Sequence, residues 1–297
     1  MYISIGIPFR NENVEHFRDA VRSVFAQDYQ DWELVLFGDG AISELMAVAE
    51  SIHDTRVTVI HSKTPVGLAG ALNRIAYAAR GEFLFRMDAD DVMAADRVRG
   101  QLQRLTEDPA IDVLSSGAYT IDEDSRVVGA TRWKALPVSQ GGYLGPTPII
   151  HPSVVARTDW FKSHPYDESF KRSQDKALWI TSSVDSRIVT SREPFLFYRV
   201  SSVLTYGKYA QSCKCERRII AQFGPEIIGV RPTQILLTKS RLRQAAFALM
   251  IAGRLGKHLA QRRHTPLDSD SMDLAQAKLD RIRAVEVPGW GETRPGH

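Results

Sequence analysis

The sequence predicts an α/β protein with a central, mostly parallel sheet flanked by helices, followed by a helical C-terminal extension. Short apolar runs alternate with helical patterns through the first half of the chain, as in βαβ units. The expected strands are followed by polar or glycine-containing turns. After about residue 206 the composition becomes basic. We therefore expect one α/β region over residues 1–205 and a helical, basic extension over 206–297.

The first half contains four expected strands with a helix after each of the first three. Apolar runs predict the strands at 3–7, 33–37, 57–60 and 83–87. Apolar residues repeating at three and four positions predict the helices at 14–25, 43–51 and 68–79. Gly81 is expected to be the C-cap glycine of the third helix. The run at 83–87 has no polar alternation in its apolar part, so we expect it at the centre of the sheet.

The second half is less regular. Its patterns predict a helix at 96–105, a hairpin from 113–119 and 127–128, a short strand at 154–155 and a helix at 176–181, and the compact part is expected to end with the run at 195–198. The Gly/Pro-rich segment 133–148 is long for a simple connection, and such loops often act as lids. Its aromatic side chains, Trp133 and Tyr143, could form a platform for a sugar ring or could simply pack within the loop.

The C-terminal extension is locally basic. No acidic residue occurs between Glu226 and Asp268, whereas Lys and Arg recur from Arg231 to Arg263. The apolar run at 245–252 lies inside this segment and predicts a basic amphipathic helix. Such a helix either packs on the core with a solvated basic face or contacts a membrane surface or a partner through residues 231–263.

Composition excludes several classes of protein. The 297 residues carry Lys+Arg 38 against Asp+Glu 35, which is too balanced to predict a nucleic-acid partner. The two cysteines, Cys213 and Cys215, can form neither a disulfide framework nor a four-ligand zinc site. We expect a cytoplasmic protein, because no signal-peptide pattern opens the chain and no uncharged apolar stretch reaches ~18 residues. Peripheral contact with the inner face of the membrane is the alternative.

Polar residues follow the expected strands at 8–12, 38–40, 61–63 and 88–91. In open α/β sheets, ligands bind beyond the carboxyl ends of the strands. Asp88 and Asp90 can point the same way if the chain stays extended, and hard cations such as Mg²⁺ or Mn²⁺ prefer carboxylate oxygens. Asp91 would then be free to cap the next helix. Alternatively all three acids form a helix-start turn, which is costly without a cation because like charges repel.

Other nucleotide-binding and hydrolytic classes are excluded by their signatures. Neither Gly-x-Gly-x-x-Gly nor Gly-x4-Gly-Lys-Ser/Thr follows the first strand, which argues against a Rossmann dehydrogenase and a P-loop NTPase. The chain also has no Gly-x-Ser-x-Gly elbow and no His-Glu-x-x-His pair.

Eight ordered motifs resemble those of family 2 glycosyltransferases, which have the GT-A fold. They are IGIPFRNE at 5–12, WELVLFGDG at 32–40, ARGE at 79–82, RMDADD at 86–91, HPS at 151–153, YDESF at 166–170, QDKALW at 174–179 and YRV at 198–200. The resemblance covers about residues 3–205. It implies a donor half over about 1–120 and an acceptor half over about 121–205.

The resemblance also implies a reaction and a set of site residues. The reaction is inverting transfer of one sugar from a nucleotide sugar, usually a UDP-sugar, to a hydroxyl acceptor that is a carbohydrate, a lipid-linked sugar or a small molecule. Mg²⁺ or Mn²⁺ would be held by Asp90 with Asp88, and Asp175 would be the general base. On sequence order alone Asp175 could equally be a helix N-cap. Residues expected to bind the nucleotide sugar are Pro8, Phe9, Arg10, Glu12, Asp39, Asn73, Asp88 and Ala89.

Several positions depart from the family pattern. Gly38 and Ala41 replace an acid and a Ser beside the base-binding edge, and Gln174 replaces the acid before Asp175. Ser201-Ser202 stands where relatives often place a His that completes the metal shell. His151 is an alternative metal or acceptor contact, although a His before Pro is commonly structural. The Gln-x-x-Arg-Trp motif of processive relatives is missing, which favours addition of a single sugar.

Two other functions fit part of the sequence. A sugar nucleotidyltransferase shares the nucleotide-binding sheet and the metal carboxylates, but its Gly-rich basic loop is missing here. A catalytically degenerate chain kept as a nucleotide-binding scaffold would explain Gly38, Gln174 and Ser201. The sugar, the acceptor, the oligomeric state and the pathway, with polysaccharide biosynthesis as one candidate, stay open.

Overall fold

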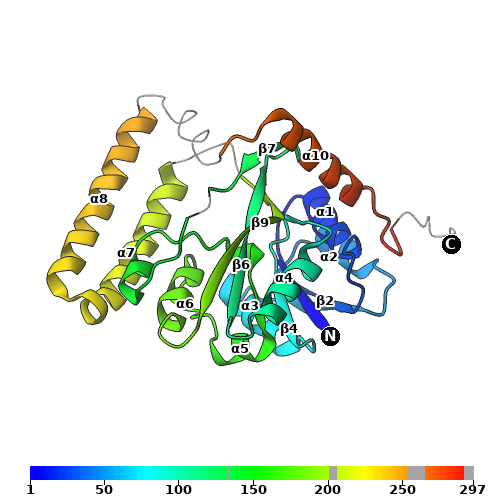
Figure 1. Cartoon of the computed structure of the whole chain (residues 1–297), viewed down its shortest axis with the longest axis horizontal. Coiled ribbons are helices and arrows are strands. Elements are labelled where there is room, and N and C mark those ends of the chain that lie inside the picture. The colour runs from blue at the N-terminus through cyan, green and yellow to red at the C-terminus, as the bar shows by residue number, and fades with distance from the viewer. Residues whose placement is uncertain (133, 201–205, 253–264, 291–297) are drawn as a thin grey trace.

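A single twisted sheet forms the centre of the molecule (Figure 1). The computed structural model describes residues 1–132, 134–200, 206–252 and 265–290. Their strands are β1 (Ile3–Phe9), β2 (Trp32–Asp39), β3 (Val57–Ser62), β4 (Phe83–Arg86), β5 (Val92–Met93), β6 (Val113–Ile121), β7 (Val127–Ala130), β8 (Val155–Arg157) and β9 (Ile188–Arg199). They are ordered β3-β2-β1-β4-β8-β6-β9-β5, and β7 pairs with β6. The first four are mutually parallel, whereas β8 is antiparallel to both neighbours, so the predicted mostly parallel sheet is confirmed.

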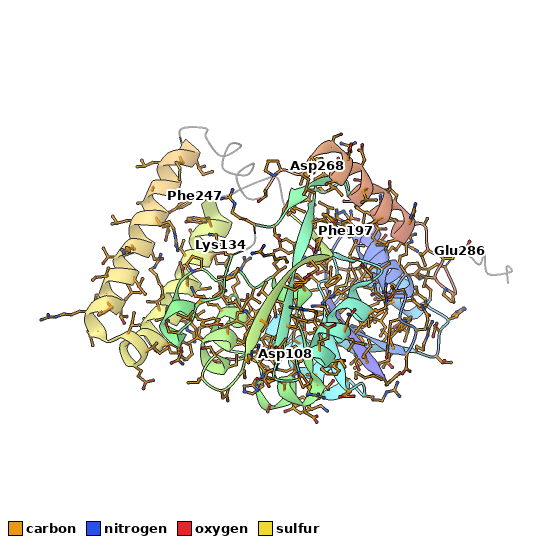
Figure 2. The ribbon with its side chains drawn as sticks, viewed as in Figure 1. Asp108, Lys134, Phe197, Phe247, Asp268 and Glu286 are labelled. Atoms are coloured by element: carbon orange, nitrogen blue, oxygen red, sulfur yellow. The ribbon has the colours of Figure 1, made fainter. Side chains whose placement is uncertain are left out.

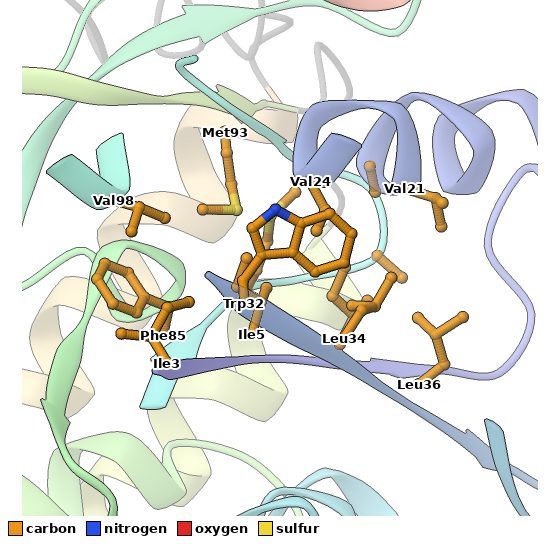
Figure 3. Packing of buried hydrophobic residues seen from close by; sticks show 14 of the residues in the cluster. Ile3, Ile5, Val21, Val24, Trp32, Leu34, Leu36, Phe85, Met93 and Val98 are labelled. Atoms are coloured by element: carbon orange, nitrogen blue, oxygen red, sulfur yellow. The ribbon is translucent and has the colours of Figure 1, made fainter. Parts of the chain in front are cut away.

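Helices cover both faces of the sheet because the strands alternate their side chains between two cores. One core lies under α1 (Val14–Phe25), α2 (Ser43–Glu50) and α4 (Arg97–Glu107). The other lies under α3 (Gly67–Ala78), α5 (Thr158–Ser163) and α6 (Gln174–Ser182). Figure 3 shows the first core, where Val21 and Val24 of α1 pack against β1 and β2.

The connection from α3 to β4 corrects one expectation. The helix ends at Ala78 with Ala79 as its cap in an extended conformation, so Gly81 is not a left-handed C-cap. A Cβ at Gly81 would instead collide with the backbone of Ile3 and Ser4 in β1. Gly81 is therefore explained by the close passage of this connection against the first strand.

The segment 133–148 is anchored at its centre. It contains the 3₁₀ helix η1 (Gln140–Leu144), in which Tyr143 and Leu144 are buried in the core beside α6. Gln140 also donates a hydrogen bond to the carbonyl of Ile180. Of the two alternatives for Tyr143, a sugar platform or packing, the burial of its ring supports packing, and this part of the loop is not a free lid. Trp133 lies outside the described residues.

The C-terminal extension forms a helical hairpin and a returning helix. The hairpin consists of α7 (Tyr206–Ile228) and α8 (Val230–Ala252), and α10 (Ser269–Arg283) packs on α1 and β7 (Figure 1). The helix predicted in the basic segment is present, but it is not amphipathic. Leu237 and Phe247 are buried, whereas Ile235, Leu242 and Leu249 are exposed. Its large apolar residues thus lie on opposite sides.

The extension is attached to the α/β region at both ends. Arg283 on α10 pairs with the buried carboxylate of Asp19 at 2.7 Å. On the other side, Glu216 of α7 pairs with Lys176 of α6 at 3.5 Å and also contacts Arg243 of α8. The predicted division of the chain at residue 205 into an α/β region and an extension stays a prediction. Residues 253–263 of the basic segment lie outside the described residues. Within the described ranges, no helix has the length and apolarity needed to cross a membrane.

Candidate active site

A cavity of about 640 Å³ opens at the carboxyl ends of β1, β2 and β4. Eight of the residues predicted to bind the donor or its metal line it together: Pro8, Phe9, Arg10, Glu12, Asp39, Asp88, Ala89 and Asp90. The sequence reasoning missed the start of α3 from Val66 to Leu68 and the segment formed by Glu168, Phe170 and Lys171. Glu168 and Phe170 belong to the YDESF motif at 166–170, which was the available signal, whereas no motif marks the start of α3 or Lys171.

Asp39 ends β2 and holds the beginning of α3. Its two carboxylate oxygens accept the backbone N–H groups of Val66 at 2.5 Å and Gly67 at 2.9 Å. A negative charge at a helix N-terminus is favourable. The neighbouring Gly38 is also explained, because a Cβ there would lie 2.7 Å from the Sδ of Met46. The missing family acid is thus replaced by apolar packing beneath the cavity.

The acidic motif forms one tight group. Carboxylate oxygens of Asp88, Asp90 and Asp91 all lie within 4.8 Å of one another. Burial, together with the charges of Asp88 and Glu12, raises the pKa of Asp90 to about 6. Burial and the other two acids raise the pKa of Asp91 well above its usual range. The group fits a hard divalent cation, because an oxygen-rich donor set with unfavourable internal repulsion is relieved by a positive ion.

The helix-cap expectation for Asp91 is wrong. The two-residue strand β5 follows it, not a helix, and Asp91 Oδ1 accepts the backbone N–H of Arg199 at 2.8 Å. The Arg199 guanidinium donates to the carbonyls of Asp90 and Asp122 and to Ser125 Oγ. Asp91 therefore fastens the end of β9 to the acidic group. The candidate third ligands Ser201 and Ser202 lie outside the described residues.

Arg86 is a buried cation that sequence reasoning did not assign. Its Nη2 donates to Asp88 Oδ1 at 2.5 Å, and its side chain is 3% exposed. Among the described residues, its Nε and Nη1 have no hydrogen-bond partner. The sequence did contain a signal for this role, because Arg86 ends an otherwise apolar strand that is expected to be buried. A buried charge needs a counter-charge nearby.

Asp175 lies in the first turn of α6, and the helix N-cap is Ser173, with a left-handed φ of 59°. The N-cap alternative for Asp175 is therefore wrong. Burial raises the pKa of Asp175, while the N–H of Lys176 and the charge of Arg86 act in the opposite direction. The carboxylate is not part of the 640 Å³ cavity wall. The charges of Arg86 and Asp88 act on its pKa in opposite directions, Arg86 lowering it and Asp88 raising it.

His151 is buried in the second half of the α/β region. Its Nε2 hydrogen-bonds Tyr166 Oη at 2.7 Å, and its ring lies edge-on to Trp179. Burial, with Arg86 nearby, holds the pKa of His151 well below its usual range, so it is neutral at neutral pH. Among the described residues, the candidate metal group contains only the three aspartates. The metal alternative for His151 is thus not supported, and an acceptor contact stays a prediction.

Asn73 connects α3 to the 166–168 segment instead of lining the cavity. Its Oδ1 accepts the N–H of Tyr166 at 2.8 Å, and its Nδ2 donates to the carbonyl of Tyr166 at 2.9 Å. A further bond from Nδ2 reaches Glu168, which does line the cavity. Asn73 thereby positions the 166–168 segment, and its predicted contact with the donor stays a prediction.

A parallel sheet with a strand-end cavity and an acidic group at its rim is the arrangement of the GT-A fold, and solved structures agree. The crystal structure of S. aureus TarS 1-349 matches with a TM-score of 0.57 and 17% identity, over 96% of this chain and 90% of that chain. The same protein in complex with UDP-GlcNAc gives a TM-score of 0.58. These likenesses establish the predicted fold.

The chain belongs to glycosyl transferase family 2, whose model matches residues 4–163. An uncharacterized glycosyltransferase of Methanocaldococcus jannaschii, MJ1057, is 24% identical over 67% of this chain and 70% of its own length. The putative glycosyltransferase EpsE of Bacillus subtilis is 26% identical over 54% of this chain, which spans 60% of EpsE. The E. coli protein WfgD, a UDP-Glc:alpha-D-GlcNAc-diphosphoundecaprenol beta-1,3-glucosyltransferase, is 23% identical over 70% of this chain and 81% of WfgD. The predicted family and enzyme class are confirmed.

Proposed function

We propose that this chain is an inverting glycosyltransferase that moves one sugar from a UDP-sugar to a hydroxyl acceptor. The observation that carries the proposal is the cavity at the strand ends. The 8–12 turn, Asp39, Asp88 and Asp90 all line it. A nucleoside can thus lie against the first two strands while its diphosphate reaches the acidic rim.

The choice of donor and acceptor rests on the relatives. WfgD is described as using UDP-Glc and a diphosphoundecaprenol-linked GlcNAc, and TarS has been solved with UDP and UDP-GlcNAc. We propose a UDP-sugar donor here, and a sugar on a lipid-linked diphosphate as the first acceptor to test. Cys213 and Cys215 are both free thiols, and we place the reaction in the cytoplasm.

Different residues of the site would hold the metal, stabilise the leaving group and accept the proton. Asp90 and Asp88 would hold Mg²⁺ or Mn²⁺, which when bound supplies positive charge to the diphosphate leaving group. Arg10 and Lys171 line the same cavity and add positive charge from the protein. Asp175 accepts the proton of the acceptor hydroxyl. The acceptor oxygen then forms its bond to the anomeric carbon as the bond to the diphosphate breaks, and the nucleoside diphosphate leaves.

The raised pKa of Asp175 suits this role, since a more basic carboxylate is a better proton acceptor near neutral pH. Arg86 limits that rise by favouring the ionised form. The nucleotidyltransferase alternative gains no support, because the family match and the cavity fit a sugar transferase instead.

The test measures nucleotide release from a panel of sugar nucleotides with Mn²⁺, with and without a lipid-linked acceptor. We expect transfer to be lost with EDTA and in Asp90→Ala. We expect Asp175→Asn to lower kcat by about 100-fold or more while UDP binding, measured by calorimetry, is retained. Asp159→Asn is the matched control, because Asp159 lies in the same half and is 94% exposed.

Three outcomes would contradict parts of the proposal. Unchanged transfer in Asp175→Asn would remove the assignment of the general base. Full activity in EDTA would remove the metal. Tight UDP binding with no turnover of any donor would favour the scaffold alternative.

A further inference from the structure

The outer side of α8 presents an apolar stripe that no described element covers. Ile235, Leu242 and Leu249 have exposed fractions of 54%, 65% and 75%, and Ala246 between them is also exposed. Residues seven apart in an α-helix differ in direction by only ~20°, so the three large residues share one side. They extend over about 21 Å at 1.5 Å per residue. We call these four residues, with Arg231 and Lys239, the outer α8 face.

The opposite side of α8 already packs against α7. Phe247 stacks on Tyr209 with ring centroids 3.9 Å apart, and Ser240 donates to Glu216 at 3.2 Å. Leu237 is 8% exposed on the same side. Figure 2 shows Phe247 on the α7 side of the helix, and Figure 1 shows α8 at the edge of the molecule. The apolar outer face is therefore additional to the residues that the hairpin needs for folding.

The charges on α8 indicate what the outer face can contact. Arg231, Lys239 and Arg241 are exposed, and α8 contains no Asp or Glu. Arg243, the remaining cation of the helix, is paired with Glu216. Only the outward side of α8 can meet a bilayer in the folded protein, and there the exposed Leu and Ile can enter the interface while the long cations reach anionic head groups.

We propose that the outer α8 face binds the surface of an anionic lipid bilayer with the helix lying parallel to it. A second copy of the chain fits less well, because two such faces would bring equal cations together and α8 supplies no carboxylate to pair with them. A single helix at the edge of the molecule also offers a convex surface, which a bilayer can accommodate. The proposal does not depend on the proposed reaction.

The experiment is co-sedimentation of the full chain with vesicles of phosphatidylcholine alone or mixed with phosphatidylglycerol. We expect binding to the anionic vesicles only, weakened by raised salt as the charges are screened. The double variant Leu242→Glu with Leu249→Glu should bind at least about tenfold more weakly, because it places two charges in the apolar stripe. Removing one cation with Lys239→Gln should weaken binding about fivefold.

The matched control is Leu274→Glu, since Leu274 is a 59% exposed leucine on α10, outside this face. Thermal unfolding checks that each variant is folded, and nucleotide release from the donor should be equal in all of them. Failure to bind anionic vesicles overturns the proposal. So does equal binding to neutral vesicles, or a dimer in sedimentation velocity that the double variant abolishes.

Discussion

Two regions contain carboxylates of limited exposure, the strand-end group of Asp88, Asp90 and Asp91 (the donor rim of the proposed site) and the surroundings of Asp175 (its proposed acceptor side), but they differ in how the charge is neutralised. Asp88 is paired with the buried guanidinium of Arg86. Asp90 makes no ion pair with a basic side chain among the described residues, and its strongest charged neighbours are Asp88 and Glu12. Asp175, on the acceptor side, has the first-turn N–H groups of α6 and the charge of Arg86.

This difference shows which charge the fold supplies and which it leaves to a ligand. On the acceptor side His151 is uncharged, and Asp175 is stabilised by backbone N–H groups of α6 and by the charge of Arg86, whose ion pair is with Asp88. The donor rim has an excess of negative charge at Asp90 and Asp91. Carboxylates that repel each other and have no protein cation to offset the repulsion are candidates for binding a metal cation. Substituting Arg86 and Asp90 separately tests whether the two regions differ in this way.

The largest expected effect comes from Arg86→Met. This change removes the cation from a buried pair and leaves Asp88 beside Asp90 and Asp91 without compensation. We expect a loss of about 3 kcal/mol in the free energy of unfolding, at the low end of the range for buried pairs, because Asp88 is 30% exposed. Urea unfolding measures it. Arg126→Met is the control, since its pair with Asp124 is on the surface and should contribute less than about 1 kcal/mol.

A loss as small as that of the control would contradict the comparison, because Arg86 would then not be the internal counter-charge. Arg86→Lys should recover part of the stability. Its single ammonium cannot reproduce the guanidinium geometry, so full recovery is not expected.

The next effect is the pH dependence of the metal-free protein. The pKa of Asp90 in the folded state is raised to about 6, above the unfolded value, so folding favours its protonated form. Its contribution to stability is therefore fully present below about pH 4 and is lost as the pH rises to about 6, by about 2 kcal/mol. Comparing urea unfolding of wild type and Asp90→Asn in EDTA between these pH values isolates it. The variant should lack this loss and be the more stable protein at pH 7.

Mn²⁺ should reverse that order at pH 7, because it binds only the folded wild-type carboxylates. Equal pH profiles for wild type and Asp90→Asn would show that the repulsion at the donor rim is already relieved within the protein. The comparison between the two regions would then fail.

The periodic parts of the chain could be predicted from sequence. Helix α1 has the predicted bounds, since Asn13 accepts the N–H groups of Glu15 and His16 and gives a clear start signal. The strand-end turns were also found, because apolar runs end there. Eight of the predicted donor-site residues consequently meet at one cavity.

The parts that could not be predicted depend on contacts far apart in sequence. Asp91 bonds to Arg199, 108 residues away, so no local pattern distinguishes this bond from a helix cap. Gly81 was explained by a helix-end rule, whereas its reason lies in the backbone of β1. The apolar residues of α8 were treated as one face, although the hairpin uses only one side of the helix. In each case the tertiary neighbour decides the role of the residue.

The smallest expected effect separates the two roles of Asp39. Asp39→Asn removes the negative charge at the start of α3 and turns one acceptor oxygen into a donor, so we expect a loss of about 1 kcal/mol in stability. If Asp39 also contacts the nucleotide, calorimetry should show weaker UDP binding in the same variant. Asp268→Asn is the matched control, because Asp268 caps α10 by accepting the N–H of Ser271 and is not part of the cavity wall. A stability loss in both variants with unchanged UDP affinity would assign Asp39 to the helix cap alone, and the nucleotide would then be held by the 8–12 turn and the acidic rim.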